Sequence, residues 1–413
     1  MKYKRLRGVK DVTGDEGMLW ENMIKTVTAV IKSRGYRLII TPVIEETALF
    51  VRGIGEASDI VLKEMYDFKD KKGRNIVLRP EGTASVVRAY IENSLPEKSD
   101  LYYIGPMFRY ERPQTGRYRE FFQAGVESFG DGSPYKDAEI IIMGNAIIKK
   151  LGISARLVIN NLGGAEEYAE KLKTFLEGAR EALCDDCLKK LERAPLRVLD
   201  CKKTETCGKA VKDAPKITEY LNGQNLKNYS KIKQLLKDAG VDFREDPKMV
   251  RGLDYYTGTV FEFITDKLGP QQNTILAGGR YDNLVKELGG KQAPATGFAL
   301  GFERISEVIK AEKSYAAGIY ETDVFVVTQE GLADKGFLTL EKLRADGVSA
   351  GMSFEVKSFK AQMREAASKG ACFAVIIGES EARKGSASVK NMKDGVQVEV
   401  EFENLSDFIK GRQ

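Results

Sequence analysis

The stretch FRYERPQTGRYREFFQAGVE, residues 108–127, places four arginines in its first twelve positions, although the net charge of the whole chain is only +5. Apolar runs at 101–111 and 120–129 flank a polar loop at 112–119. This order predicts an antiparallel β-hairpin whose loop is strongly basic.

The second strand of that hairpin carries polar residues at alternate positions. Residues two apart on a strand share a face, so Gln123, Gly125 and Glu127 point the same way. The glycine is expected to leave an open space between an amide and a carboxylate, which is typical of a pocket floor. A solvent-facing strand with polar alternation is the other interpretation. Arginines suit a phosphate ligand, because the guanidinium group offers planar paired donors and keeps its charge.

Length and composition indicate a globular chain of 413 residues, 42% of them apolar, which is long enough for two or three domains. No run of eighteen apolar residues occurs, and no apolar segment follows the charged N-terminal residues. We therefore expect a cytoplasmic protein with no membrane partner. Five cysteines are too few for a disulfide framework in a chain of this size.

The chain contains no histidine. A Ser-His-Asp triad, an imidazole base and a histidine metal ligand are therefore excluded. Arg, Lys, Asp, Glu, Tyr and Cys remain available for catalysis and binding.

The spacing of apolar residues predicts the order of elements. Helices are expected at 18–34, at 84–93 and, after a run of small residues from 296, up to 309. Strands are expected at 37–44 and 75–78, and a mixture of strand and turn at 250–264 and 274–285. Residues 162–245 are charged and helix-forming, as in an insertion. Beyond a boundary near 313–322, strands alternate with helices, which predicts a separate small α/β domain.

Several further segments carry arginines, glycines and tyrosines together. They are RPEGT (79–83), RGLDYYTGTVFEF (251–263), LAGGRYDNLV (276–285) and GFALGFERI (297–305). With TPVIEETALF (41–50) and GPMFRYERPQTGRYREFFQ (105–123), they resemble, in this order, the histidyl-tRNA synthetases of the class II aminoacyl-tRNA synthetases. TPVIEETALF, the hairpin and GFALGFERI are similar to the three class motifs, and RGLDYYTG is highly specific. The resemblance covers nearly the whole chain.

The resemblance implies a fold, a reaction and partners. The implied fold is α/β (α+β): a class II antiparallel-sheet catalytic domain over residues 1–320 with a largely helical insertion at about 162–245, and a small α/β anticodon-binding domain over 321–413. The implied enzyme is a ligase that activates L-histidine with ATP and Mg²⁺ and transfers it from the adenylate to the 3′ end of tRNA(His). The first motif implies a homodimer.

The resemblance also implies roles for residues at matching positions. Arg109 and Arg251 are the implied catalytic residues, both acting on the α-phosphate. ATP contacts are implied for Arg109, Glu111 and Arg304. Histidine contacts are implied for Glu81, Thr83, Gln123, Glu127, Arg251, Tyr255, Tyr256 and Tyr281. The candidates for contact with the tRNA acceptor end are Arg112, Gln114, Arg117 and Arg119.

The chain departs from the family's pattern where relatives often have histidine. Tyr110 and Phe122 stand at these two positions, and because both keep an aromatic ring we interpret them as packing replacements. From residue 322 onward, 13 Lys and Arg face 14 Asp and Glu, so any tRNA-binding patch in the C-terminal domain must be local.

The missing histidine also affects the expected pH dependence. An inflection of histidine activation between about pH 5.5 and 7 is expected to come from the substrate's imidazole, since no imidazole exists in the chain. A charged carboxylate at Glu127 would favour a charged ring, so binding is expected to weaken as the pH rises past the free imidazole's pKa.

Four cysteines, Cys184, Cys187, Cys201 and Cys207, are either a zinc site or reduced structural residues. The first two have the CxxC spacing, but five residues separate the second two, which is looser than a usual zinc knuckle. The sequence therefore favours reduced cysteines and no resident metal.

A regulatory subunit of histidine biosynthesis is the alternative function. Such paralogues resemble the synthetase, bind ligand and partner, and usually lack the C-terminal module and intact catalytic segments. This chain keeps both, which favours the enzyme.

Overall fold

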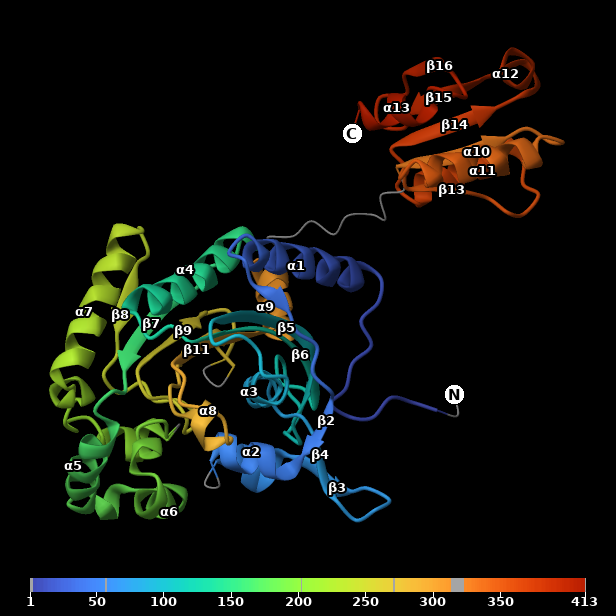
Figure 1. Cartoon of the computed structure of the whole chain (residues 1–413). Helices are drawn as coiled ribbons and strands as arrows, with labels where there is room; N and C mark the ends of the chain where they lie inside the picture. Colours follow the sequence, from blue (N-terminus) through green and yellow to red (C-terminus); the bar gives the residue numbers. More distant parts are fainter. Residues whose placement is uncertain (1–2, 56–57, 202, 270–271, 313–322, 413) are drawn as a thin grey trace. The chain divides into compact units, whose positions relative to one another are not determined.

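The computed structural model describes residues 3–55, 58–201, 203–269, 272–312 and 323–412. The chain divides into two compact units, Met1–Tyr315 and Ala316–Gln413 (Figure 1). The domain boundary predicted near 313–322 lies outside the described residues.

An eight-stranded, mostly antiparallel sheet forms the centre of the first unit. Its order is β1 (Arg37–Leu38), β5 (Ser99–Phe108), β6 (Glu120–Phe129), β11 (Ala295–Gly301), β10 (Thr274–Arg280), β9 (Thr259–Ile264), β7 (Arg156–Asn161) and β8 (Phe243–Glu245). Only the outermost pairs, β1 with β5 and β7 with β8, run parallel. The antiparallel-sheet fold predicted from the sequence is confirmed.

The predicted hairpin of β5 and β6 lies within this sheet. Phe108 pairs with Glu120 and Ser99 with Phe129, so the two strands match over their full length. On the other side of β6, strand β11 pairs from Ala295 to Gly301. The hairpin therefore supplies the central strands rather than an exposed edge.

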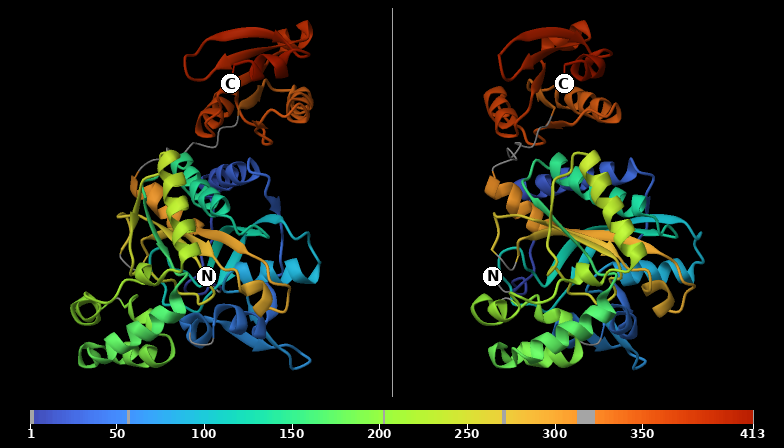
Figure 2. Two further views of the ribbon diagram at one scale, coloured as in Figure 1. Left: turned by 60° about the vertical axis from the view of Figure 1, so that its left-hand side comes forward. Right: turned by 90° about the vertical axis from the view of Figure 1, so that its left-hand side faces the viewer.

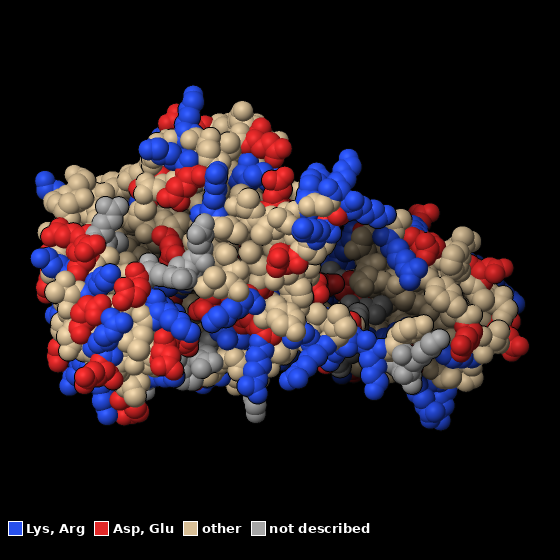
Figure 3. All heavy atoms as spheres, turned by 90° about the horizontal axis from the view of Figure 1, so that it is seen from below, with Lys and Arg blue, Asp and Glu red and all other residues tan. Residues whose placement is uncertain are grey.

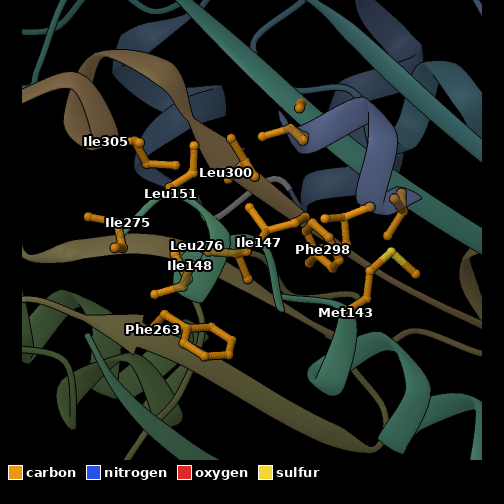
Figure 4. Packing of buried hydrophobic residues seen from close by; sticks show 14 of the residues in the cluster. Met143, Ile147, Ile148, Leu151, Phe263, Ile275, Leu276, Phe298, Leu300 and Ile305 are labelled. Atoms are coloured by element: carbon orange, nitrogen blue, oxygen red, sulfur yellow. The ribbon is translucent and has the colours of Figure 1, made fainter. Parts of the chain in front are cut away.

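Helices cover one face of the sheet and form the main core with it. They are α1 (Asp15–Lys32), α4 (Pro134–Lys150), α7 (Gly223–Asp238) and α9 (Phe302–Glu312). Inward residues of α4, such as Met143 and Ile147, pack against Leu276 and Phe298 from the strands (Figure 4). Burial of this apolar surface fixes the register of the strands, because a shift by one residue would turn every side chain to the other face.

The other face of the sheet is only partly covered. Helices α2 (Thr47–Ile54), α3 (Thr83–Glu92) and α8 (Leu284–Glu287) pack there with a small antiparallel sheet ordered β2 (Ile44–Glu46), β4 (Asn75–Leu78) and β3 (Tyr66–Lys69). The short π-helix η1 (Ile60–Glu64) follows α2. The uncovered part of this face is open to the cavity described below.

The range 162–245 contains two different structures. Its first part packs around its own apolar cluster and contains α5 (Ala165–Glu177), η2 (Arg180–Ala182), α6 (Asp185–Arg193), η3 (Pro195–Val198), η4 (Thr204–Gly208) and η5 (Ile217–Tyr220). Helices α5 and α6 lie at one end of the first unit (Figure 2), and acidic and basic residues lie side by side over much of the surface seen in Figure 3. The second part differs from an insertion, because α7 packs on α4 and β8 extends the main sheet.

The predictions for two segments, one strand and one helix, differ from the structure. The expected strand at 37–44 is divided into β1 and β2, which belong to different sheets. The small residues after 295 form strand β11, and the helix begins only at Phe302. Glycine and alanine weaken a strand on propensity alone, so tertiary pairing with β6 and β10 decides this segment.

The second unit contains a five-stranded mixed sheet. Its order is β13 (Ala350–Met352), β12 (Val324–Thr328), β14 (Phe373–Ile377), β15 (Ser386–Asn391) and β16 (Gln397–Glu401). The helices are α10 (Ala333–Ala345), α11 (Phe359–Ser368), α12 (Glu379–Lys384) and α13 (Leu405–Lys410), and apolar clusters form on both faces of the sheet. Within the described part of the whole chain, no helix combines the length and the apolar character needed to span a membrane.

Candidate active site

The open face of the main sheet forms the floor of a cavity of about 1000 Å³. Its lining includes all eleven residues for which the sequence predicts contacts with ATP or histidine. These are Glu81, Thr83, Arg109, Glu111, Gln123, Glu127, Arg251, Tyr255, Tyr256, Tyr281, Arg304 and, from the predicted tRNA-contacting loop, Arg117 in addition. The residues come from segments that are up to 223 positions apart in sequence, as Glu81 and Arg304 are.

Strand β6 supplies the centre of the floor. Gln123, Gly125 and Glu127 share the face that is opposite to the main core, as their alternation predicts. The space over Gly125 is not open, however. The ring of Tyr103 occupies it, and a Cβ at Gly125 would overlap that ring. Gly125 is therefore required for the close packing of Tyr103, which itself lines the cavity.

Glu127 is a buried carboxyl group held by two hydroxyl groups. The Thr83 hydroxyl donates to Oε1 at 2.7 Å, and the Tyr281 hydroxyl donates to Oε2. Gly297 on the neighbouring strand leaves the room for this carboxyl, because a Cβ there would overlap Oε2. Burial raises the pKa of Glu127 to about 8, although the two hydroxyl donors lower it and nearby Glu81 raises it further.

Several buried polar atoms in the cavity wall have no hydrogen-bond partner among the described residues. They are the hydroxyl of Tyr103, Oε1 of Gln123 and Nε of Arg251. Buried polar groups in native proteins are nearly always hydrogen-bonded, so three such atoms in one cavity indicate a polar ligand. The sequence analysis did not identify Tyr103 as a residue of the site. Its position opposite Gly125 in the predicted hairpin is the feature that could have indicated it.

Glu81 lies at the beginning of α3 in the RPEGT turn. Its two carboxylate oxygens accept the backbone N–H groups of Thr83 and Ala84, both at 2.7 Å. The first N–H groups of a helix have no acceptor within the helix itself, and a negative charge close to them is favoured. Burial nevertheless raises the pKa of Glu81.

Three arginines, Arg109, Arg117 and Arg304, gather at one end of the cavity. Arg304 donates to the carbonyl oxygens of Gly116 at 3.1 Å and Thr274 at 2.8 Å. Burial and the positive charges of Arg109 and Arg117 lower the pKa of Arg304 to about 10. The cluster is therefore under mutual repulsion, which an anionic ligand would relieve.

Arg109 and Arg251 are held on different sides of the cavity. Arg109 donates through Nε to the Pro80 carbonyl at 2.9 Å and lies over the ring of Phe121. Arg251 forms an ion pair with Glu262, which also accepts from the Thr274 hydroxyl at 3.0 Å. These contacts fix both guanidinium groups before any ligand binds.

The loop between β5 and β6 does not act as one unit. Arg117 turns into the cavity and forms an ion pair with Glu111 at 2.5 Å. Arg112 and Arg119 instead line a second, smaller cavity of about 310 Å³ together with Arg7. Gln114 is exposed. The structure thus brings Arg117 to the predicted ATP residues and separates it from the other candidates for tRNA contact.

The two aromatic replacements differ in burial, since Phe122 is half-buried whereas Tyr110 is 55% exposed. The Phe122 ring meets Trp20 edge-on at 5.4 Å between centroids, and the Tyr110 ring meets Tyr66 at 5.5 Å. The backbone N–H of Phe122 also donates to Glu303 at 3.0 Å. Burial raises the pKa of Glu303 to about 7, so a carboxyl of the protein as well as the substrate's imidazole can titrate near neutral pH.

The fold and this cavity define a class II aminoacyl-tRNA synthetase catalytic domain. Residues 8–305 match the family model of histidyl-tRNA synthetase, and residues 324–412 match that of an anticodon binding domain. The chain therefore belongs to the histidyl-tRNA synthetase family.

Relatives over the full length agree with this membership. The chain is 43% identical to the histidine–tRNA ligase of Halothermothrix orenii, over 98% of each chain, and 41% identical to that of Bacillus subtilis, over the whole of both. The crystal structure of apo histidyl-tRNA synthetase from S. aureus is 35% identical, covers 99% of this chain and 100% of that chain, and superimposes with a TM-score of 0.80.

The buried Glu127 carboxyl leads to a prediction on stability. Because the pKa of Glu127 is raised from 4.5 to about 8 in the folded chain, its contribution to stability is full below pH 4.5 and is lost as the pH rises through about 8. Because glutamine does not ionise, Glu127→Gln should not lose this stability as the pH rises. Between pH 5.5 and 8, the unfolding free energy of the variant should gain about 3 kcal/mol relative to the wild type. Urea unfolding without ligand at both pH values measures the difference, and an equal difference at both would contradict the raised pKa.

Proposed function

We propose that the chain is a histidine–tRNA ligase that uses this cavity to activate histidine with ATP. The observation that supports this best is that one cavity holds both the buried Glu127 carboxyl, whose pKa is raised to about 8, and the guanidinium groups of Arg109, Arg251 and Arg304. The first suits the imidazole of histidine, and the second suits the phosphates of ATP. ATP use is common to the family.

The first step needs positioning rather than a protein base. The histidine carboxylate is already ionised at neutral pH and attacks the α-phosphorus of ATP, and pyrophosphate leaves. Negative charge shifts onto the α-phosphate oxygens, where fixed donors stabilise it. In the proposal Arg109 and Arg251 act there, and Arg304 binds the triphosphate further out. A chain without histidine can perform this step.

Mg²⁺ on the outer phosphates is part of the proposal. The ion takes oxygen ligands, usually one or two carboxylates together with substrate phosphates. Glu111 offers such a carboxylate near Arg304 and would hold the ion, which would neutralise phosphate charge.

Histidine recognition is proposed for the other end of the cavity. Glu81, Thr83 and Gln123 would bind the α-amino group, for which the unpartnered Oε1 of Gln123 is an available acceptor. Glu127, Tyr256 and Tyr281 would surround the imidazole, with Tyr255 packed behind them. An apolar competitor would leave the Glu127 carboxyl without its partner, which gives selectivity of about 10⁴ without an editing domain.

Contacts with tRNA are proposed for two regions. Arg112, Gln114 and Arg119 stand on the loop outside the main cavity and would meet the acceptor end, mainly through phosphates. Arg117 would serve ATP and the acceptor end together. Residues 324–412 would bind the anticodon of tRNA(His), as the matched domain implies.

A homodimer working in the cytoplasm completes the proposal. Leu38, Ile40 and Ile44 are 53%, 82% and 50% exposed, beside or within TPVIEETALF. Exposed apolar side chains gathered next to an edge strand favour a partner surface, and a second copy is the occupant that the class motif implies.

The alternative of a regulatory subunit has less support. An ATP phosphoribosyltransferase regulatory subunit/histidyl-tRNA synthetase from Bacillus halodurans shares the fold, with 21% identity and a TM-score of 0.66. Histidine-dependent exchange of pyrophosphate into ATP separates the two functions. We expect exchange that requires both histidine and Mg²⁺; a regulatory subunit would give none.

Arg251 should matter for rate more than for binding. Arg251→Ala is expected to lower adenylate formation at least about 100-fold, because its donors meet charge that develops only in the transition state. Histidine and ATP affinities should change little. Arg156→Ala is the matched control, since Arg156 lines the same cavity but pairs with exposed Asp266. Single-turnover rates measure the effect, and a loss of affinity as large as the loss of rate would contradict it.

The raised pKa of Glu127 changes the pH dependence that the sequence predicts. The bound pair of carboxyl and imidazole shares one proton. Free enzyme and free histidine carry together one proton only between the imidazole pKa, about 6.5, and the Glu127 pKa of about 8.

Histidine affinity should therefore be greatest between these values and weaken on both sides, rather than fall from the imidazole pKa upward. Titration calorimetry with histidine alone, without ATP, measures the profile. Glu127→Gln should lose the decrease above pH 8 and keep the decrease below 6.5. A wild-type profile that falls steadily from pH 6.5 would show that Glu127 is charged in the free enzyme.

A further inference from the structure

The insertion brings the four cysteines together. Cys184 is the N-cap of α6, and Cys187 lies in the first turn of that helix. Cys201 follows η3, and Cys207 lies in η4. The four sulfur atoms all lie within 4.8 Å of one another. The spacing between the last two, which the sequence suggested was too loose, therefore does not keep their sulfur atoms apart.

These separations suit a single tetrahedral ion. Zinc binds four thiolates at about 2.3 Å, which places sulfur atoms about 3.8 Å apart at the corners of a tetrahedron. Cys184 and Cys201 are already 4.0 Å apart. All four cysteines are free rather than joined in disulfides. Small movements of the side chains would therefore close the site around one ion.

Backbone groups around the cluster favour thiolates. The N–H of Cys184 donates to the sulfur of Cys207 at 3.2 Å, and the N–H of Lys203 donates to Cys201. Cys187 and Cys207 are 1% and 0% exposed, so their sulfur atoms are shielded from solvent. Four uncharged thiols interact only weakly with one another, whereas a cation would bind all four sulfur atoms.

The small size of this segment also favours a cross-link that stabilises it. Between α5 and η5, only about 56 residues pack around their own apolar cluster, which includes Leu172, Leu191 and Val198. Units of this size often depend on a metal or disulfides, because they bury too little apolar surface. Cys187 and Cys207 belong to this cluster, and the half-buried Cys184 and Cys201 pack against it.

The cluster adjoins a segment that reaches the active site. Arg197 in η3 is 8% exposed and donates to Asp254 at 2.7 and 3.0 Å and to the Gly252 carbonyl at 3.3 Å. Gly252 and Asp254 belong to the RGLDYY loop that carries Arg251 and Tyr256. Leu199 and Asp200, directly before Cys201, line the main cavity.

We propose that Cys184, Cys187, Cys201 and Cys207 bind one zinc ion as four thiolates, and that the ion holds residues 195–201 against the RGLDYY loop. Binding releases the thiol protons to solvent and forms four Zn–S bonds, with no change of oxidation state. The site is structural, because all four positions are occupied by protein and none is left for water or substrate.

Metal content tests the first half of the proposal. The full-length chain, purified under reducing conditions and supplied with zinc, should hold one zinc per chain by elemental analysis. Cys372→Ser is the matched control, because Cys372 is exposed and outside the cluster, and it should keep the zinc. Cys201→Ser and Cys207→Ser should each lose most of it. Absence of zinc from the wild type, equal loss in Cys372→Ser, or iron with sulfide in place of zinc would each overturn the assignment.

A second measurement on the wild type avoids the risk that the variants misfold. Cobalt in place of zinc should give the intense visible absorption of a tetrahedral thiolate site. A thiol reagent should modify one cysteine rapidly in the zinc form and all five after chelation. Rapid modification of the cluster with zinc present would contradict a closed site.

Proteolysis tests the second half without depending on the proposed activity. Removing zinc should raise trypsin cleavage within 185–213 about tenfold, as expected when local unfolding becomes easier, while cleavage in the C-terminal unit stays unchanged. Arg197→Lys with zinc bound should leave the metal content intact but loosen the RGLDYY loop, seen as faster amide exchange at 251–256. Unchanged exchange there would show that the zinc segment does not position the loop.

Discussion

The burial of the Glu127 carboxyl connects more of this structure than any other single contact. Its two oxygens are held by Thr83 at the start of α3 and by Tyr281 after β10, and Gly297 of β11 leaves the space for it. Three segments that are far apart in sequence therefore meet at one group. Removing a carboxyl from water disfavours its charged form, which is why its pKa rises toward 8. The fold maintains a group that destabilises it above neutral pH, as is common where a site must bind a polar ligand.

At the other end of the cavity, burial also disfavours a charged form, but there the charged groups are arginines and the charge is positive. Arg304 is half-buried beside Arg109 and Arg117, and the pKa of Arg304 is lowered although guanidinium groups keep their charge almost everywhere. Among the groups that most affect the pKa of Arg304, only the carboxylates of Glu111 and Glu262 favour its charged form. Backbone contacts such as the hydrogen bond from Arg304 to the Thr274 carbonyl position this guanidinium group. A polyphosphate would convert the repulsion into attraction, and the same groups then need no rearrangement during the reaction.

The insertion contacts the RGLDYY loop of the active site through Arg197. Arg197 leaves the small helical cluster and reaches Asp254, three residues from Arg251. Because a short segment connects the cysteines to the cavity lining, the stability of the insertion and the position of the RGLDYY loop are linked physically. This gives a structural reason for a peripheral cluster to affect an active site without touching substrate.

The sequence by itself determined the parts that depend on local pattern. The alternation on 120–129 predicted the hairpin and the common face of Gln123 and Glu127, because side-chain direction on a strand follows from its period of two. Motif residues were specific enough to predict the family and the lining of the cavity. Tertiary structure alone decided which neighbours those residues meet. It placed Tyr103 over Gly125, turned Arg117 inward to Glu111, joined α7 to the main core and raised the pKa of Glu127. Each of these depends on contacts between distant segments and on exclusion of water, and neither quantity can be read from residue order.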